Sequence, residues 1–321
     1  MTLTLTRRIL LGTAFVFGLA GAAAADYPER AITLVIPFAA GGSTDVVGRI
    51  VAERMSADLG QQVIVQNVGG AGGSLGATQV AEADPDGYTI LMGTVATHAL
   101  NPLILKQKPY DPVADFAPVS LLVLVPNVLA VNPELPVQNV QELIDLAKTQ
   151  PLAYASSGNG TPLHLSGELF KAMAGVDITH IPYKGSGPAL TDVLGNQVPI
   201  IFDNLPSASG HITSGKLRAL GVTTAERAPS FPDVPAIAET LPGYETYSWN
   251  ALFAPAGTPP EAVARLNAAA VAAMADPAVV ARMGEFSASI VASSPEDLAQ
   301  HVKAEMTKWE PVVTDANVTM D

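Results

Sequence analysis

The stretch that decides the fold is Ile32-Thr-Leu-Val-Ile-Pro-Phe-Ala-Ala-Gly-Gly-Ser-Thr-Asp45. Its β-branched and aliphatic start predicts a strand over 32–38. Two glycines then precede Ser43 and Thr44, residue types that favour a helix N-terminus, and we expect a helix over 45–59. Glycines before a helix let backbone N–H groups converge on an anion. Because the loop contains no lysine, it is better suited to a carboxylate than to a phosphate.

The segments that follow alternate between strand and helix patterns. Strand patterns at 62–66 and 88–92 enclose a short helix pattern at 77–83. A strand, helix, strand, helix, strand order is typical of a parallel sheet with helices on both faces.

The same alternation restarts in the second half of the chain. We expect helices at 141–149 and 161–173, and strands at 152–156, 178–183, 198–203 and 217–222. The loop Ser157-Gly-Asn-Gly160 joins a strand to a helix, as the first loop does. The sequence therefore predicts two α/β lobes, each with a glycine-containing loop at the carboxyl end of a strand, where α/β sheets bind ligands.

Two long apolar segments bounded by prolines, 116–131 and 246–254, are interpreted as crossings between the lobes. Apolar residues at helical spacing follow them, and we expect these C-terminal helices to pack back on the first lobe. The predicted division is lobe 1 over 26–124 and 248–321, and lobe 2 over 125–247.

Residues 1–25 have the features of a secretory signal peptide. Arg7-Arg8 precede an apolar run, and Ala23-Ala24-Ala25 is a small-residue cleavage site. The arginine pair also fits a twin-arginine signal, although the general export route is favoured. The chain has no cysteine, which excludes a lipoprotein anchor and disulfides.

The net charge of −13 describes an acidic protein. Such a surface argues against nucleic acid and anionic membranes as partners. It still allows an anionic ligand, because N–H dipoles inside a cleft act locally.

Evidence for catalysis is weak. Gly72-Gly-Ser-Leu-Gly76 matches the nucleophile pattern of serine hydrolases, so an exported hydrolase using Ser74 is the alternative function. That pattern requires a strand leading directly into the turn, and residues 67–71 intervene here. The five histidines form no metal-binding pair, and no dinucleotide fingerprint is present, so we expect no metal and no cofactor.

Three further side chains lie near the predicted cleft. His164 is at the start of a helix, where hydrogen bonding to that helix or its loop is favoured over direct ligand contact. Asp203 ends a strand; it would either face the ligand or order the N–H groups of the next loop, and a carboxylate ligand makes the second role safer. Lys184 is a candidate charge at the cleft rim.

Several motifs in order resemble one known family. They are Pro37–Asp45, Gly69-Gly-Ala-Gly-Gly73, Ala83-Asp-Pro-Asp-Gly-Tyr88, Tyr154-Ala-Ser-Ser-Gly158, His180-Ile-Pro-Tyr-Lys-Gly185, Phe202-Asp-Asn-Leu-Pro206 and Gly215-Lys-Leu-Arg-Ala-Leu220. Together they are similar to the periplasmic receptors of tripartite tricarboxylate transporters, the Bug family. One departure is Asn67-Val-Gly, where the family usually has Asn-Arg-Pro.

The resemblance implies a two-lobed, type II periplasmic binding fold, with a mainly parallel sheet flanked by helices in each lobe. It implies a non-catalytic receptor that binds a dicarboxylate, tricarboxylate or aromatic acid and delivers it to membrane permease subunits. A monomer suits such a receptor. A sensor for a membrane signalling partner would use the same fold and stays open.

The resemblance also implies where the ligand binds: to backbone N–H groups and hydroxyls of the two glycine-containing loops, completed by the segment 94–98 and by Asp203. The expected ligand-binding residues are Phe38, Ala39, Ala40, Gly41, Gly42, Ser43, Thr44, Thr97, His98, Ser156, Ser157, Gly158, Gly160, Thr161, His164 and Asp203.

Overall fold

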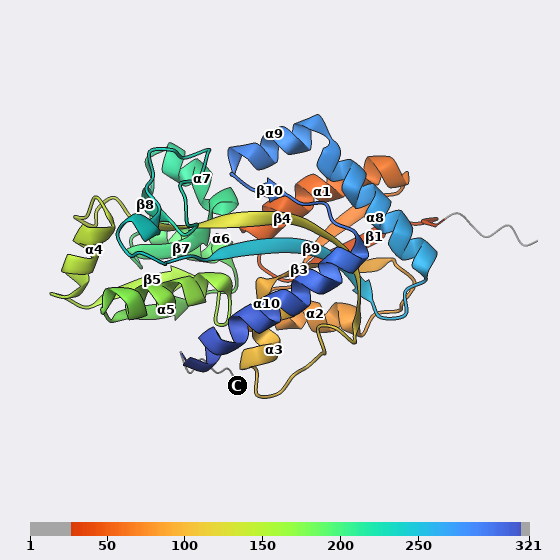
Figure 1. The fold of residues 1–321 in the computed structure, drawn as a ribbon. Helices are drawn as coiled ribbons and strands as arrows, with labels where there is room; N and C mark the ends of the chain where they lie inside the picture. Colours follow the sequence, from red (N-terminus) through yellow and green to blue (C-terminus); the bar gives the residue numbers. More distant parts are fainter. Residues whose placement is uncertain (1–26, 316–321) are drawn as a thin grey trace, which may run out of the picture.

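Two antiparallel strands, β4 (Phe116–Val131) and β9 (Tyr247–Pro255), run between the two halves of the molecule (Figure 1). The computed structural model describes residues 27–315, so the predicted signal peptide lies outside the described residues. Within that range the sheet has the order β2-β1-β3-β9-β4-β7-β5-β6, and β8 and β10 also pair with β4. β4 therefore belongs to both lobes, since it pairs with β9 along most of its length and with β7 at Asn127–Val131.

The first lobe follows the predicted alternation. β1 is parallel to β2 and β3, and β9 is antiparallel to β3. The structure starts the first two helices two and three residues earlier than predicted and adds a π-helical turn, η2. The elements are β1 (Ile32–Ile36), α1 (Ser43–Leu59), β2 (Val63–Asn67), η1 (Ala71–Gly73), α2 (Ser74–Ala81), β3 (Thr89–Thr94), η2 (Ala96–Leu100) and α3 (Asn101–Ile104).

The second lobe repeats the arrangement. β5 is parallel to both β6 and β7, while β7 and β8 run antiparallel to β4. Its elements are α4 (Val140–Ala147), β5 (Leu152–Ser156), α5 (Pro162–Ala174), β6 (Ile178–Pro182), α6 (Ser186–Leu194), β7 (Ile200–Asn204), α7 (Leu205–Thr213), β8 (Arg218–Val222) and η3 (Ile237–Glu239).

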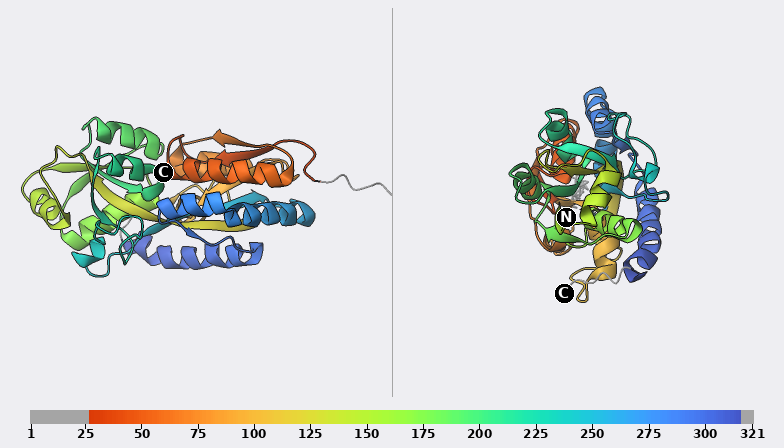
Figure 2. Two further views of the ribbon diagram at one scale, coloured as in Figure 1. Left: turned by 90° about the horizontal axis from the view of Figure 1, so that it is seen from above. Right: turned by 90° about the vertical axis from the view of Figure 1, so that its left-hand side faces the viewer.

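The C-terminal segment returns to the first lobe. It contains α8 (Pro260–Ala275), α9 (Pro277–Glu285), β10 (Ser289–Ile290) and α10 (Pro295–Asp315). α8 packs on α1 and β4, and α10 packs on β4 and η2. Figure 2 shows these blue helices beside the orange N-terminal elements, at the opposite end from the green second lobe. The exact division at 124/125 and 247/248 stays a prediction, because β4 and β9 continue through both boundaries without a break.

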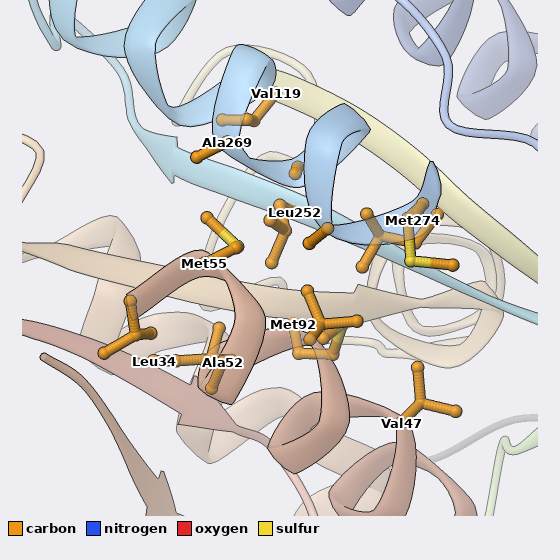
Figure 3. Close-up of a cluster of buried hydrophobic side chains, with 14 of the residues drawn as sticks. Leu34, Val47, Ala52, Met55, Met92, Val119, Leu252, Ala269 and Met274 are labelled. Atoms are coloured by element: carbon orange, nitrogen blue, oxygen red, sulfur yellow. The ribbon is translucent and has the colours of Figure 1, made fainter. Parts of the chain in front are cut away.

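The core of the first lobe fixes the strand that leads into the first loop. Leu34 on β1 belongs to a buried cluster that also contains Met55 on α1, Met92 on β3 and Met274 on α8 (Figure 3). The next residue, Val35, is buried in the cluster on the opposite face of the sheet. β1 is thus covered on both sides, as expected for a central parallel strand, and the loop after it starts from a fixed point.

The described chain was also searched for membrane-spanning helices. Between residues 27 and 315, no single helix is long and apolar enough to cross a membrane, although α8 and α9, joined at a bend of 68°, meet the length and composition criteria as a pair.

Candidate functional site

A small cavity lies between the lobes, lined by residues that follow β1 and residues that follow β5. Its volume is about 30 Å³. Its wall is made of hydroxyls, amides and a few apolar side chains, and none of its lining residues is ionisable. They are Phe38, Gly42, Ser43, Thr44, Thr94, Ser157, Thr161, Pro162, Leu163, Ser186, Asn204, Ser248, Trp249 and Asn250.

Four helices of the described chain begin at this cavity. Gly42, Thr161 and Asn204 are the N-caps of α1, α5 and α7, and Ser186 is the first residue of α6. The backbone N–H groups in the first turn of a helix lack intrahelical acceptors. No side chain caps α1, and its first residues Ser43 and Thr44 line the cavity. Helix N-termini carry partial positive charge, and their convergence favours an anion without any cationic side chain.

The first loop is held in shape by Asn67, the residue just before the departure from the family pattern at Val68-Gly69. Its Nδ2 donates to the Phe38 carbonyl at 3.0 Å and to Asp45 Oδ1 at 2.9 Å, and its Oδ1 accepts from Arg49 at 3.1 Å. Asp45 in turn accepts the Gly41 N–H at 3.0 Å. Burial opposes the charge on Asp45, but its bonds with Arg49, Gly41 and Asn67 outweigh burial and lower its pKa.

These bonds decide which backbone groups of the loop remain available. The Gly41 N–H is used by Asp45, and the Ala39 N–H donates to the Lys184 carbonyl at 3.1 Å. Among the residues predicted for the first loop, Phe38, Gly42, Ser43 and Thr44 line the cavity. The amides of Ala39 and Gly41 instead fix the loop itself.

The second loop is supported from behind by two stacked imidazoles. His164 and His180 lie with ring centroids 4.1 Å apart. Gly160 donates its N–H to His164 Nδ1 at 3.2 Å, and Ser156 Oγ lies 2.6 Å from His180 Nε2. Burial lowers the pKa of both histidines, to about 3 for His180, so both rings are neutral at neutral pH.

The predicted residues of this second segment divide in the same way. Ser157 and Thr161 line the cavity, and Gly158 lines an adjoining one. Ser156 and Gly160 instead hydrogen-bond to His180 and His164 and so stabilise the loop. His164 takes the supporting role that the sequence favoured and does not line the cavity.

Asp203 also supports the site from behind. It is fully buried at the end of β7, where Ser186 Oγ donates to its Oδ1 and Ser207 Oγ donates to Oδ2 at 2.8 Å. Burial raises its pKa to about 6, although the hydrogen bonds from Ser186, Ser207 and the Asn204 backbone oppose the shift. The carboxylate therefore positions Ser186 and the start of α7, rather than facing the cavity.

Within the predicted segment 94–98, Thr97 and His98 do not line the cavity. The π-helical turn η2 carries His98 into the core of the first lobe, where its ring stacks on Phe253 at 3.7 Å. Thr97 Oγ1 lies 2.9 Å from His98 Nδ1. Thr94, at the end of β3, is the residue of this region that reaches the cavity.

Several lining residues were missing from the predicted set. Pro162 and Leu163 start α5, Ser186 starts α6, and Asn204 caps α7. Ser248, Trp249 and Asn250 come from β9, the crossing strand that passes the cavity. An asparagine within the apolar run 246–254 was the signal available in the sequence, since a polar side chain in a buried strand needs a partner.

A second cavity adjoins the first, because Phe38 and Ser157 line both. Its volume is about 170 Å³, and its other lining residues are Gly70, Ala71, Gly72, Gly73, Gly158, Asn159, Pro182, Tyr183 and Lys184. Lys184 is the one cationic residue in the two linings. The two cavities therefore share part of their wall.

Ser74 lacks the surroundings of a nucleophile. It is buried at the start of α2, after η1 instead of directly after a strand, and its Oγ accepts from Asn101 Nδ2 at 2.8 Å. A serine nucleophile requires a base within hydrogen-bond reach, and the partner here is an amide.

Comparison with known proteins identifies the family. The model of the tripartite tricarboxylate transporter family receptor matches residues 47–318. The chain belongs to this family. Among its relatives, the protein BugT of Bordetella pertussis is 38% identical over 308 residues, which cover 94% of this chain and 94% of BugT.

Solved structures place the receptor among periplasmic binding proteins. The periplasmic binding protein BugD matches with a TM-score of 0.89 and 38% identity, covering 92% of this receptor and 100% of BugD. A Rhodopseudomonas palustris protein solved with adipate matches with a TM-score of 0.88 and 41% identity, over 92% and 99% of the two chains. MatC of Rhodopseudomonas palustris, solved with malate, matches with a TM-score of 0.85 and 36% identity, covering 89% of this receptor and 100% of MatC. The predicted family and its two-lobed fold are confirmed.

Proposed function

We propose that this receptor binds a small organic acid between its lobes in the periplasm and delivers it, chemically unchanged, to the permease subunits of a secondary transporter. It would act as a monomer after removal of the signal peptide near Ala25. The observation that carries this proposal is the convergence of four helix N-termini on a cavity with no ionisable side chain. Such a site favours an anion, and the hydroxyls of Ser43 and Thr44 add donors that suit carboxylate oxygens.

The available donors are strong enough for a receptor. Charge-assisted hydrogen bonds contribute about 1.5–3 kcal/mol each, and micromolar binding corresponds to about 8 kcal/mol. Three or four such bonds to one carboxylate therefore suffice. The relatives solved with adipate and malate support a carboxylic acid as the ligand.

The rest of the ligand would extend past Phe38 into the second cavity. That cavity is less confined, and Lys184 at its edge offers a charge for a second carboxylate. Dicarboxylates therefore suit the pair of cavities, while aromatic acids would use the Phe38 and Trp249 rings.

Calorimetry with a panel of acids and their amides tests the carboxylate site. We expect saturable binding of at least one dicarboxylate, succinate and adipate included in the panel, and loss of binding for the diamide. Absence of binding across mono-, di- and tricarboxylates and aromatic acids would contradict the proposal.

A variant tests the position of the site. Gly42 has an ordinary φ of −83°, so its backbone tolerates valine, but a Cβ there would lie 3.4 Å from Ser186 Cβ and the methyl groups would occupy the cavity. Gly42→Val should weaken binding at least tenfold. Gly210→Val is a control, because a Cβ at Gly210 meets nothing within 4 Å. Equal affinity of Gly42→Val and the unmodified receptor would show that the acid binds elsewhere.

Two further measurements address delivery and catalysis. Uptake of a bound acid by vesicles that contain the permease subunits should require the receptor. The acid recovered from the receptor should be unchanged by mass spectrometry, and Ser74→Ala should bind it as well as the unmodified protein does. Hydrolysis of an ester that depends on Ser74 would favour the hydrolase instead.

A further inference from the structure

Asn250 is a buried polar side chain in the cavity wall whose carbonyl oxygen has no partner. It lies on β9 and is 3% exposed. Its Nδ2 makes a long contact of 3.4 Å with Thr44 Oγ1, and Oδ1 has no hydrogen-bond partner among the described residues. A buried polar atom without a partner costs about 1–3 kcal/mol. A group of the bound molecule is therefore expected to pair with this amide.

The position of Asn250 specifies which part of the ligand it meets. Its neighbour Thr44 lies in the first turn of α1, whose N–H groups form the proposed carboxylate site. With its two oxygens bound by the α1 N–H groups, the carboxylate would lie beside Asn250, so the amide would be within reach of a substituent on the adjoining carbon.

The surroundings decide the chemistry of that substituent. An ammonium group would lie among helix N-termini of positive partial charge, and no lining residue supplies a carboxylate to neutralise it. A hydroxyl carries no charge and can both donate and accept. It can donate to Oδ1 or, with the amide turned over, accept from Nδ2, so its recognition does not depend on the amide orientation.

We infer that Asn250 recognises a hydroxyl on the carbon beside the bound carboxylate, so that this receptor prefers 2-hydroxy acids. The inference rests on the proposed carboxylate site and adds the substrate class to it. A site built to pair with a hydroxyl discriminates against an analogue that lacks the group, because the buried amide is then left unpaired. We expect discrimination of about tenfold or more, as one lost hydrogen bond predicts.

Malate and succinate form the decisive pair, because they share a four-carbon dicarboxylate skeleton and differ in the 2-hydroxyl. Calorimetry on the full mature receptor should show malate binding at least tenfold more tightly than succinate. Lactate and propionate test the same difference on a monocarboxylate. In Asn250→Leu, the ratio of the malate and succinate affinities should fall to about one, mainly by loss of malate affinity.

Controls separate this role from general damage. Asn250→Ala introduces no bulk and serves as a second variant in case leucine disturbs folding. It should give the same fall in the ratio of the malate and succinate affinities. Gln141→Leu, at an exposed position on α4, should leave the ratio unchanged. Equal affinities for malate and succinate in the unmodified receptor, or an unchanged ratio in both Asn250 variants, would overturn the inference and leave the carboxylate site standing. Failure of every acid to bind would instead overturn the proposed function.

Discussion

The Ala39 N–H donates to the Lys184 carbonyl at 3.1 Å, which joins the backbone of the first lobe directly to that of the second. Glycines make this approach feasible. A Cβ on Gly187 would lie 2.2 Å from the Ala40 carbonyl oxygen, and one on Gly72 would lie 2.5 Å from the Asn159 oxygen. Contacts this short are not tolerated, so the lobes meet where side chains are absent. The closed arrangement therefore depends on glycine at these positions.

Gly187→Ala should oppose closure without disturbing either lobe. Gly187 lies in the first turn of α6, where alanine is a good helix former. Its Cβ would meet Ala40 of the other lobe, so closure would require a shift of the backbone. We expect ligand affinity to fall at least tenfold in calorimetry, with the free energy of unfolding changed by less than about 1 kcal/mol. Gly210→Ala is the matched control, and equal affinities of the two variants would contradict this role.

Glu305 should influence the cavity through Trp249, although it lies on α10. Its carboxylate accepts from Trp249 Nε1 at 3.1 Å, Trp309 Nε1 at 3.3 Å and Tyr247 OH at 2.9 Å. Glu305→Leu leaves the two buried indole donors and the half-buried Tyr247 hydroxyl without this acceptor, so we expect a loss of about 2–4 kcal/mol in unfolding free energy, measured with urea. Tryptophan emission should shift, and ligand affinity should fall. Glu310→Leu, at an exposed position on the same helix, should change neither affinity nor emission.

The sequence predicted the fold well because hydrophobic periodicity is a local signal. The crossing segment 116–131 matches β4 residue for residue, and 246–254 lies within one residue of β9 at either end. Helix starts were less accurate. α2 begins at Ser74, three residues before the predicted start at residue 77, because the glycine-rich η1 turn leads directly into the helix.

The cavity was predicted only where the lining comes from the loops themselves. Ser43 and Thr161 could be placed because they start helices after strands. Asn250 and Trp249 reach the cavity through the pairing of β9 with β3 and β4, which no local pattern reports. His98 lies away from the cavity for a related reason, since a π-helical turn carries its ring onto Phe253.

Asn67→Ala should disturb the first loop without removing any cavity-lining group. The hydrogen bonds of the Asn67 side chain with the Phe38 carbonyl, Asp45 and Arg49 would be lost together. We expect a loss of about 1–3 kcal/mol in unfolding free energy, since one buried carbonyl and a carboxylate lose a donor. Ligand affinity should also fall in calorimetry. Gln66→Ala, at the adjacent position of β2, is the control, and a similar effect of both changes would rule out a specific role for Asn67.

His98 should make the receptor less stable at acidic pH. Its ring is fully buried, and burial lowers its pKa from 6.5 to about 3. Between these values the unfolded chain binds a proton that the folded chain does not, so this contribution to stability is complete above pH 6.5 and is lost as the pH falls towards 3. At pH 5 the loss should be about 2 kcal/mol relative to pH 7.

Urea unfolding at pH 7, 6 and 5 measures this contribution in His98→Leu. The leucine also removes the stacking on Phe253, so the slope of unfolding free energy against pH is the informative quantity, rather than its value at one pH. We expect the slope to decrease by up to about 1.4 kcal/mol per pH unit. His211→Leu is the control, because that ring is only half-buried. Parallel pH profiles for His98→Leu and the unmodified receptor would show that His98 binds the same number of protons in the folded and unfolded states across this range. The explanation would then fail.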